Sequence, residues 1–304
     1  MCGLFGFSQY GNNGIKNLDE LTNSLARQSA VRGTDATGIA MCNKGKINII
    51  KDSKSAFKLE FTHKDNVPAL MAHTRRATQG SERKNYNNHP FYGRTKNANF
   101  AFAHNGVLIN DRELRARLNL PRTKIETDSY IGVQLIESMK KLNMSSIKYM
   151  AETVEGSFSF TLLDNRNNLY IVKGDSPISL LHFPAHKIYV YASTNEILYK
   201  ALVDSPLFKS LRNGDFEEIA VEDGTILKIS SSGHIESMTF DYQYNIGKSW
   251  WEYGYGYSKE DTAKDEYVEC LKSVAIFEGF DEKVIDDLLN EGFSMDEIEE
   301  YIYC

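Results

Sequence analysis

Residues 1–6 read Met-Cys-Gly-Leu-Phe-Gly, and the cysteine at position 2 decides how the rest of the chain is interpreted. Aminopeptidases remove Met1 when the next side chain is small, so we expect Cys2 to become the first residue. A thiol has an ordinary pKa of about 8.5 and an α-amine one of about 7.7–8.0, so part of the amine is unprotonated at neutral pH. The amine can then activate the thiol of its own residue. This stretch therefore predicts a Cys2 nucleophile whose own α-amine is the general base.

The composition is that of an ordinary globular protein. The chain has 304 residues, of which 41% are hydrophobic and 25% charged. The N-terminal stretch has no basic region followed by an apolar one, and no run approaches the ~18 apolar residues of a membrane span. The four cysteines lack the spacing of metal ligands or of a disulfide framework. We expect a cytoplasmic protein with no membrane contact, no metal and no disulfides.

Charge and aromatic residues divide the chain into three parts. The net charge is −6, but residues 259–304 alone hold 15 acidic and 4 basic side chains. Residues 240–257 hold eight aromatic side chains with one lysine and no arginine, which argues against nucleic-acid binding. We predict a main domain over residues 2–235, an aromatic-rich linker over 236–260, and a small acidic helical domain over 261–304. Ser294 and Glu297 have the spacing of a capping box in that last domain.

Short runs rich in alternating or β-branched residues dominate the main domain. Strands are predicted at 46–51, 99–104, 156–164, 169–173, 187–192 and 224–230. Helical periodicity is present at 18–27, 112–118 and 128–142. Because many strands have few helices between them, the pattern favours antiparallel sheets with helices outside, and not a doubly wound parallel sheet.

Two segments carry side chains suited to a carboxylate and to an oxyanion. Residues 73–80 read His-Thr-Arg-Arg-Ala-Thr-Gln-Gly, and an arginine such as Arg75 at a strand end can bind a carboxylate through two parallel hydrogen bonds. Residues 103–106 read Ala-His-Asn-Gly directly after an apolar run. The side-chain amide of Asn105 and the backbone N–H of Gly106 form the kind of donor pair that stabilises an oxyanion.

Three other segments supply polar groups. Residues 87–91 form a polar turn that ends in His89-Pro90-Phe91, and residues 126–129 place Asp128 before a helix, where a carboxylate can bind an ammonium group. Residues 32–38 indicate a turn that supports the nucleophile. Any one of these segments is modest evidence, whereas Cys2 followed by all of them in order is strong evidence.

Together these segments resemble the glutaminase domain of class II glutamine amidotransferases, the N-terminal-nucleophile type found in glucosamine-phosphate synthase and the amidophosphoribosyltransferases. The resemblance extends over roughly residues 2–230, with 154–164, 174–180, 192–198 and 217–229 in matching order. It implies an α+β fold, a four-layer α/β/β/α sandwich of two antiparallel sheets, and no cofactor. It also implies L-glutamine as substrate, which is hydrolysed through a Cys2 thioester to glutamate and ammonia.

The same resemblance implies a role for each matching residue. Cys2 would be the nucleophile, Asn105 and Gly106 the oxyanion hole, Arg75 and Asp128 the sites for the α-carboxylate and α-ammonium of glutamine. Thr78 and His89 would line the amino-acid pocket, and Arg32 would support the terminus. Three positions depart from the family pattern: Arg76 stands where an aromatic residue is usual, Gln79 where histidine is frequent, and Ala36 where serine is frequent. The change at Arg76 predicts an unfamiliar coupling to the ammonia acceptor.

The acceptor and two rival functions remain open at this point. About 70 residues follow the predicted domain, too few for the synthase domain of the familiar enzymes. Either a separate synthase docks through residues 240–304, or the chain is a stand-alone amidohydrolase. The rivals are a γ-glutamyl amide or peptide hydrolase on the same fold and a non-enzymatic scaffold. His73 and His104 flank strands and are more typical of structural histidines than of substrate ligands.

Overall fold

The computed structural model describes residues 2–11, 15, 18–62 and 67–242, together with residues 272, 275, 280, 281, 283–293 and 298. The chain divides into two compact units, Met1–Tyr244 and Asn245–Cys304. None of the described helices is long and apolar enough to span a membrane.

The strand that follows Cys2 lies in the middle of a seven-stranded sheet. The order is β11-β9-β10-β1-β4-β2-β3, and every neighbouring pair is antiparallel. The strands are β1 (Gly3–Gln9), β2 (Ala36–Asn43), β3 (Lys46–Asp52), β4 (Ala69–Arg75), β9 (Ser179–Phe183), β10 (Ile188–Ala192) and β11 (Glu217–Ile219). All seven residues of β1 are buried, since strands cover both of its edges and other layers cover both of its faces.

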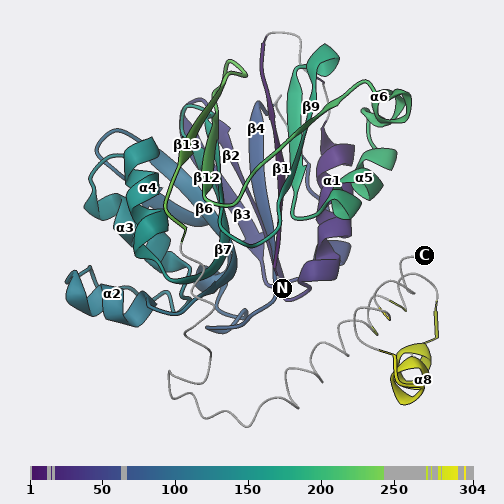
Figure 1. Ribbon diagram of the computed structural model, residues 1–304, viewed down its shortest axis with the longest axis horizontal. Helices are drawn as coiled ribbons and strands as arrows, with labels where there is room; N and C mark the ends of the chain where they lie inside the picture. The colour runs from purple at the N-terminus through teal and green to yellow at the C-terminus, as the bar shows by residue number, and fades with distance from the viewer. Residues whose placement is uncertain are drawn as a thin grey trace. The chain divides into compact units, whose positions relative to one another are not determined.

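A second antiparallel sheet has six strands in the order β13-β12-β8-β7-β6-β5. They are β5 (Phe91–Arg94), β6 (Asn99–Leu108), β7 (Gly156–Asp164), β8 (Leu169–Lys173), β12 (Thr225–Ile229) and β13 (Ile235–Thr239). The two sheets stack face to face, and helices cover the outer face of each (Figure 1). The predicted four-layer α/β/β/α sandwich is confirmed.

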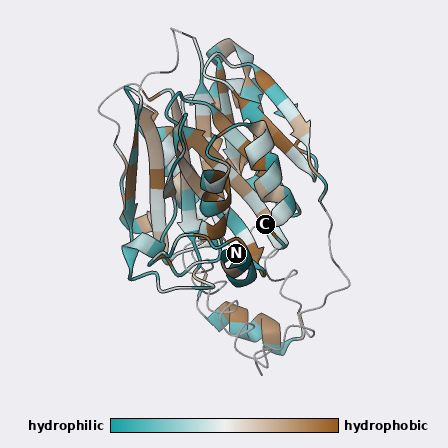
Figure 2. Cartoon of the chain, turned by 90° about the vertical axis from the view of Figure 1, so that its left-hand side faces the viewer, coloured by the Kyte–Doolittle hydropathy of each residue, from teal (hydrophilic) through white to brown (hydrophobic). Residues whose placement is uncertain are grey.

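The helices fall into two groups, one on each outer face. Helices α1 (Asp19–Ser29), α5 (Asn195–Val203) and α6 (Phe208–Asn213) lie on the side of the first sheet. Helices α2 (Asp111–Arg117), α3 (Tyr130–Ser138) and α4 (Met144–Thr153) lie on the side of the second. Hydrophobic residues are concentrated along the strands, and hydrophilic ones in the connecting loops (Figure 2).

Alternation along each strand divides the apolar side chains between the layers. In β1, Phe5 and Phe7 pack with the helices, whereas Leu4 points to the other sheet. In β6, Phe100 and Phe102 pack with helices, and two small alanines, Ala101 and Ala103, face the first sheet. Because successive strand residues point to opposite faces, one strand can contribute to two cores.

The predicted elements of the main domain are present, with some differences at their ends. All six predicted strands occur, as β3, β6, β7, β8, β10 and β12, and β6 runs four residues further, to Leu108. The central strand β1 was not predicted, because a strand buried on both faces shows no alternation of polar and apolar residues. The helix predicted over 128–142 is shorter, Tyr130–Ser138.

The second sheet continues beyond residue 235, where we expected the main domain to end. Strand β13 pairs with β12 from Ile235 to Thr239, and Phe240 is buried in the core beside α4. The first part of the predicted linker therefore belongs to the sheet. In the second unit, α8 (Lys283–Asn290) is described, and Lys272 forms an ion pair with Asp286. The remaining linker residues from 243 and the predicted capping box at Ser294 lie outside the described residues.

Candidate active site

Cys2 lies directly before β1, next to the end of β4. The antiparallel register sets Gly3 opposite Thr74, so the next pair along the ladder is Cys2 and Arg75. The backbone N–H of Arg76 donates to Cys2 Sγ at 3.4 Å, and the thiol donates to the Arg76 carbonyl oxygen, also at 3.4 Å. The thiol is thus held against the first residue of the loop that follows β4.

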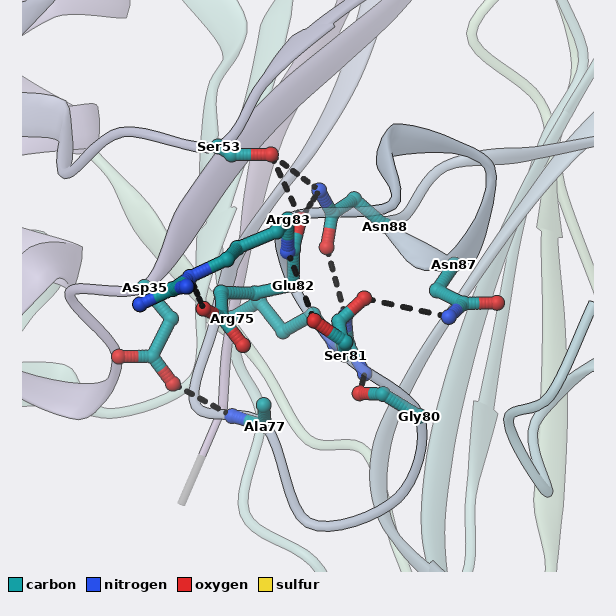
Figure 3. Close-up of polar contacts among 10 residues, drawn as sticks. All are labelled: Asp35, Ser53, Arg75, Ala77, Gly80, Ser81, Glu82, Arg83, Asn87 and Asn88. Carbon is teal, nitrogen blue, oxygen red and sulfur yellow. Dashed lines mark hydrogen bonds and ion pairs between the residues drawn. The ribbon is translucent and has the colours of Figure 1, made fainter.

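The turn after α1 supports Cys2 and this loop from the other side. Arg32 Nε donates to the Cys2 carbonyl oxygen at 2.9 Å, in the place where we expected a supporting contact. A Cβ atom on Gly33 would lie 2.4 Å from the Arg75 carbonyl carbon, so the close approach requires glycine. Asp35 Oδ2 accepts a hydrogen bond from the Ala77 backbone N–H at 2.7 Å (Figure 3).

Arg75 ends β4 as a buried cation, with a side chain only 3% exposed. Its Nη1 donates to Asn88 Oδ1 at 2.6 Å, and its Nη2 donates to the carbonyl oxygens of Gln79 and Gly80 at 2.7 and 2.8 Å. Among the described residues, no carboxylate forms an ion pair with it. Burial lowers the pKa of Arg75, and a buried cation bound only to neutral oxygens favours the arrival of an anion.

A hydrogen bond between the sheets brings β6 to this site. His73 on β4 contacts the carbonyl oxygen of His104 on β6 through Nε2, at 3.0 Å. Asn105 follows directly; its side chain is 1% exposed, and its Nδ2 has no hydrogen-bond partner among the described residues. A buried amide donor without a partner costs free energy unless a ligand accepts from it.

Gly106 comes next in a conformation that other residues rarely adopt. Its φ is +132°, and a Cβ atom there would lie 2.0 Å from the Ser157 carbonyl oxygen of β7. Only glycine therefore lets β6 stay paired with β7 at this point and keeps its backbone N–H beside Asn105.

Asp128 is joined to the same strand. Its Oδ2 accepts from the Leu108 backbone N–H at 2.7 Å, and its Oδ1 accepts from the Ser129 backbone N–H at 2.7 Å. Ser129 Oγ lies 3.1 Å from Asp128 Oδ1 and 2.8 Å from His104 Nδ1. These bonds fix the buried carboxylate of Asp128 beside β6, the strand that carries Asn105 and Gly106.

Neighbouring charged and polar groups act on the pKa of the Cys2 thiol. Burial raises the pKa of the Cys2 thiol, and the backbone N–H of Arg76 and the positive charge of Arg75 oppose this rise. The negative charge of Asp128 also raises that pKa. A cation and an anion therefore act on one thiol, which indicates that Cys2, Arg75 and Asp128 share a site.

Three buried histidines, His73, His89 and His104, lie beside the site. Burial lowers the pKa of His73 to about 3, and it lowers those of His89 and His104 as well. His89 packs between His73 and Phe91, with ring centroids 4.2 and 4.4 Å away. Within the described part of the chain, no group of three side chains suits a metal ion.

Comparison with known proteins relates part of this chain to a family. Residues 73–200 match the family described as the glutamine amidotransferase domain. The glutamine–fructose-6-phosphate aminotransferase (isomerizing) of Staphylococcus aureus is 30% identical over 189 residues, which cover 59% of this chain and 30% of that protein. The enzyme of the same name from Sulfurisphaera tokodaii is 29% identical over 187 residues, 59% of this chain and 31% of that protein.

The fold has solved counterparts too. The glutamine phosphoribosylpyrophosphate amidotransferase of B. subtilis superposes with a TM-score of 0.63 at 19% identity, over 80% of this chain and 50% of that one. The chain contains a class II glutamine amidotransferase domain. It spans only about a third of the length of the curated relatives that it matches.

The amidotransferase domain does not bring every predicted site residue together. Cys2, Arg32, Arg75, Asn105, Gly106 and Asp128 lie on adjoining elements, as described above. Thr78 is exposed on the loop after β4, and none of the described residues is hydrogen-bonded to its side chain. His89 is buried with both ring nitrogens unpartnered among the described residues. Both assignments to the pocket stay predictions.

Two residues of the amidotransferase domain were missed by sequence reasoning. Asn88 contacts Arg75 directly, and Lys51 Nζ donates to the carbonyl oxygens of Asn88 and Pro90. The sequence did indicate the face on which Lys51 lies, because alternation along β3 puts it on the same side as Ile47 and Ile49. For Asn88 there was none, because three asparagines occur in the four residues 85–88.

Proposed function

We propose that this protein hydrolyses the side-chain amide of L-glutamine at Cys2 and passes the ammonia to an acceptor. The observation that carries the proposal is the juxtaposition of Cys2, Arg75 and Asp128. Cys2 is the neighbour of Arg75 in the ladder of β1 and β4, and the contact of His73 with the His104 carbonyl oxygen joins β4 to β6, whose Leu108 N–H binds Asp128. A free amino acid carries a carboxylate and an ammonium group on the same carbon. An anchored arginine and an anchored aspartate on two sides of a nucleophile match that pair of charges.

The proposed reaction begins when removal of Met1 frees the α-amine of Cys2. The amine takes the thiol proton, and the thiolate attacks the side-chain carbonyl carbon of glutamine. Asn105 Nδ2 and the Gly106 backbone N–H donate to the resulting oxyanion, a contribution that is typically about 3–4 kcal/mol for one donor. The C–N bond then breaks, the nitrogen leaves as ammonia with the proton from the amine, and water hydrolyses the γ-glutamyl thioester.

Specificity for the free amino acid follows from the same two charges. A glutamine in the middle of a peptide has neither a free α-carboxylate nor a free α-ammonium, so it would leave Arg75 and Asp128 without their ligands. Buried charges that lose their partner are costly. This argues for free glutamine over a glutamine within a peptide. A γ-glutamyl amide or peptide keeps both α-groups, so the two charges do not discriminate against that rival, and a comparison of substrates is needed to do so.

Residues 240–304 are the candidate docking segment for the protein that accepts the ammonia. The curated relatives are named for the amination of fructose 6-phosphate, and the chain covers only about a third of their length. We propose that a separate synthase docks through residues 240–304 and receives the ammonia. Comparing the proteins that co-purify with the full chain and with a chain ending before residue 240 would identify it.

A glutaminase assay on the full chain tests the function. Cys2→Ala should lower glutamate production at least about a thousandfold, because it removes the thiol that forms the thioester. Cys42→Ala is the matched control, since Cys42 is a buried free cysteine of β2 that packs in the core. Mass spectrometry of the N-terminus should show that the active form begins at Cys2.

Two results would reject the proposal. Full activity in protein that retains Met1 would exclude the α-amine as base, and turnover of γ-glutamyl peptides without turnover of glutamine would favour the rival hydrolase. A parent protein without either activity would leave the scaffold hypothesis.

A further inference from the structure

Arg75 needs something that holds its side chain in place before a substrate arrives. A free guanidinium at the end of a strand has several rotamers, and binding a carboxylate would cost the free energy of ordering them. Here the buried guanidinium is fixed by three neutral oxygens and not by an acid. Two of these oxygens are backbone carbonyls of the loop, and the third belongs to the side chain of Asn88.

Asn88 is the most constrained of these partners. Its side chain is completely buried, and its Nδ2 donates to the Glu82 carbonyl oxygen at 2.8 Å, with Asn85 Oδ1 and Ser53 Oγ at 3.2 and 3.3 Å. Ser53 Oγ in turn donates to the same Glu82 carbonyl oxygen, which leaves the lone pairs of Ser53 Oγ to face the amide (Figure 3).

These contacts decide which way the Asn88 amide points. With three acceptors around its nitrogen, the amide must turn its oxygen toward Arg75 Nη1. The reverse orientation would set N–H groups against the N–H groups of Arg75 at one end and the amide oxygen against three acceptor oxygens at the other. Asn88 therefore presents a fixed acceptor to a cation, and charge-assisted hydrogen bonds of this kind are among the stronger ones.

The backbone of Asn88 is fixed as well. Lys51 on β3 reaches the carbonyl oxygens of Asn88 and Pro90, and its ammonium lies over the Phe91 ring at 5.2 Å from the centroid. Burial, together with the charge of Arg75, lowers the pKa of Lys51 to about 8. Lys51 thus anchors the turn that carries Asn88.

We infer that Asn88 is a positioning residue that orients Arg75 for the α-carboxylate of the substrate, an inference that rests on the proposed function. An arginine has five N–H groups. Asn88 takes one on Nη1, and the Gln79 and Gly80 carbonyls take two on Nη2, so one N–H on Nη1 and the one on Nε remain to donate to a carboxylate, each from its own edge of the guanidinium. Asn88 acts through Arg75 and sets the affinity for substrates that carry this group.

Calorimetric titration of the Cys2→Ala chain tests this role without turnover. The two ligands are L-glutamine and L-glutaminamide, in which an amide replaces the α-carboxylate. Adding Asn88→Ala should weaken glutamine binding about ten- to a hundredfold, because a charge-assisted hydrogen bond that orients Arg75 is lost. Glutaminamide does not use the Arg75 charge, so its affinity should change less than about twofold.

Three further variants separate positioning from general damage. Asn87→Ala is the matched control, because Asn87 is equally buried in the same turn but bonds to Ser81 and Glu126, not to Arg75. Asn88→Asp keeps the size of the side chain and pairs Arg75 internally, so it should lose at least about tenfold in glutamine affinity while remaining folded. In an Arg75→Lys background, Asn88→Ala should add little.

Equal losses for both ligands, or the same glutamine-selective loss in Asn87→Ala, would overturn the role of Asn88. Turnover by the parent chain is measured separately. Turnover without a carboxylate-selective loss in Asn88→Ala overturns only this inference, whereas absence of both turnover and glutamine binding overturns the proposed function with it.

Discussion

Lys51 is a residue of the site whose charge changes close to the neutral range. It is a half-buried lysine on an edge strand, and its pKa is lowered to about 8 by partial burial and by the charge of Arg75. The other titratable groups that it faces are His73 and His89, whose own pKa values are lowered far enough to keep them neutral. Below about pH 8, Lys51 therefore adds a second positive charge beside Arg75.

We predict that glutamine affinity depends on this charge. As the pH rises from 7 to 9, Lys51 loses its proton, and a carboxylate bound at Arg75 loses part of its electrostatic attraction, about five- to tenfold in affinity. Lys51→Arg keeps the charge at every pH and should lack this loss. The α-amines of the protein and of glutamine titrate in both proteins, so the difference between their pH profiles isolates Lys51. Parallel profiles for the two proteins would contradict the prediction.

Individual site residues could be predicted from sequence only where a motif carried them. Cys2, Arg75, Asn105 and Gly106 each occur in a segment whose residue types define a chemical task. Alternation along β3 indicates the face on which Lys51 lies, but no local pattern encodes its contact with Asn88, 37 residues away, or that of Asn88 with Arg75, 13 residues away. Thr78 belongs to a motif but is exposed, because the position of a loop side chain depends on what the loop closes over.

At the scale of elements, the pairing of β6 with β7 fixes the positions of Asn105 and Gly106, the proposed donors to the oxyanion. Gly106 has a φ of +132°, and the Ser157 carbonyl oxygen occupies the place of any Cβ. The strand was predicted to end near residue 104, but the ladder continues to Leu108 opposite Gly156. The polar residues Asn105 and Gly106 interrupt the apolar pattern, and backbone pairing overrides that interruption.

Gly106→Ala should therefore damage both stability and activity. Strain and contact with Ser157 together should lower the free energy of unfolding by about 3 kcal/mol, measured by urea denaturation. Gly214→Ala is the control, because Gly214 also has a positive φ, of +75°, but nothing lies within 4 Å of its added Cβ. Gly214→Ala should lower the free energy of unfolding by only about 1 kcal/mol. Equal costs would show that the contact with Ser157 relaxes freely.

In the amidotransferase domain as a whole, the two sheets meet across an apolar layer that contains small and polar residues beside the site. The face between the sheets carries Ala101 and Ala103, and the contact between His73 and His104 crosses it beside the site. The layered class of fold was predictable from many short strands with few helices. The order of the strands was not, because pairings such as β1 with β10 join residues almost the whole domain apart.

The buried histidines predict how the domain responds to acid. Their pKa values are lowered in the folded state, that of His73 to about 3, against about 6.5 in an unfolded chain. Between these values the unfolded state binds more protons, so stability falls as the pH falls below about 6.5, by up to about 1.4 kcal/mol per pH unit for each histidine. At pH 5, His73 alone would cost about 2 kcal/mol, and the lowered pKa values of His89 and His104 add to this loss in the same direction.

His89 offers the cleanest test of this dependence, since neither of its ring nitrogens has a described hydrogen-bond partner to lose. His89→Leu should reduce the slope of unfolding free energy against pH, between about pH 6 and 5, by about 1 kcal/mol per unit. His234→Leu is the control, because His234 is exposed between β12 and β13 and stays hydrated in the folded and unfolded protein. Urea denaturation at several pH values measures both slopes. If His89→Leu keeps the slope of the parent, His89 is protonated in the folded domain, and its burial does not hold it neutral.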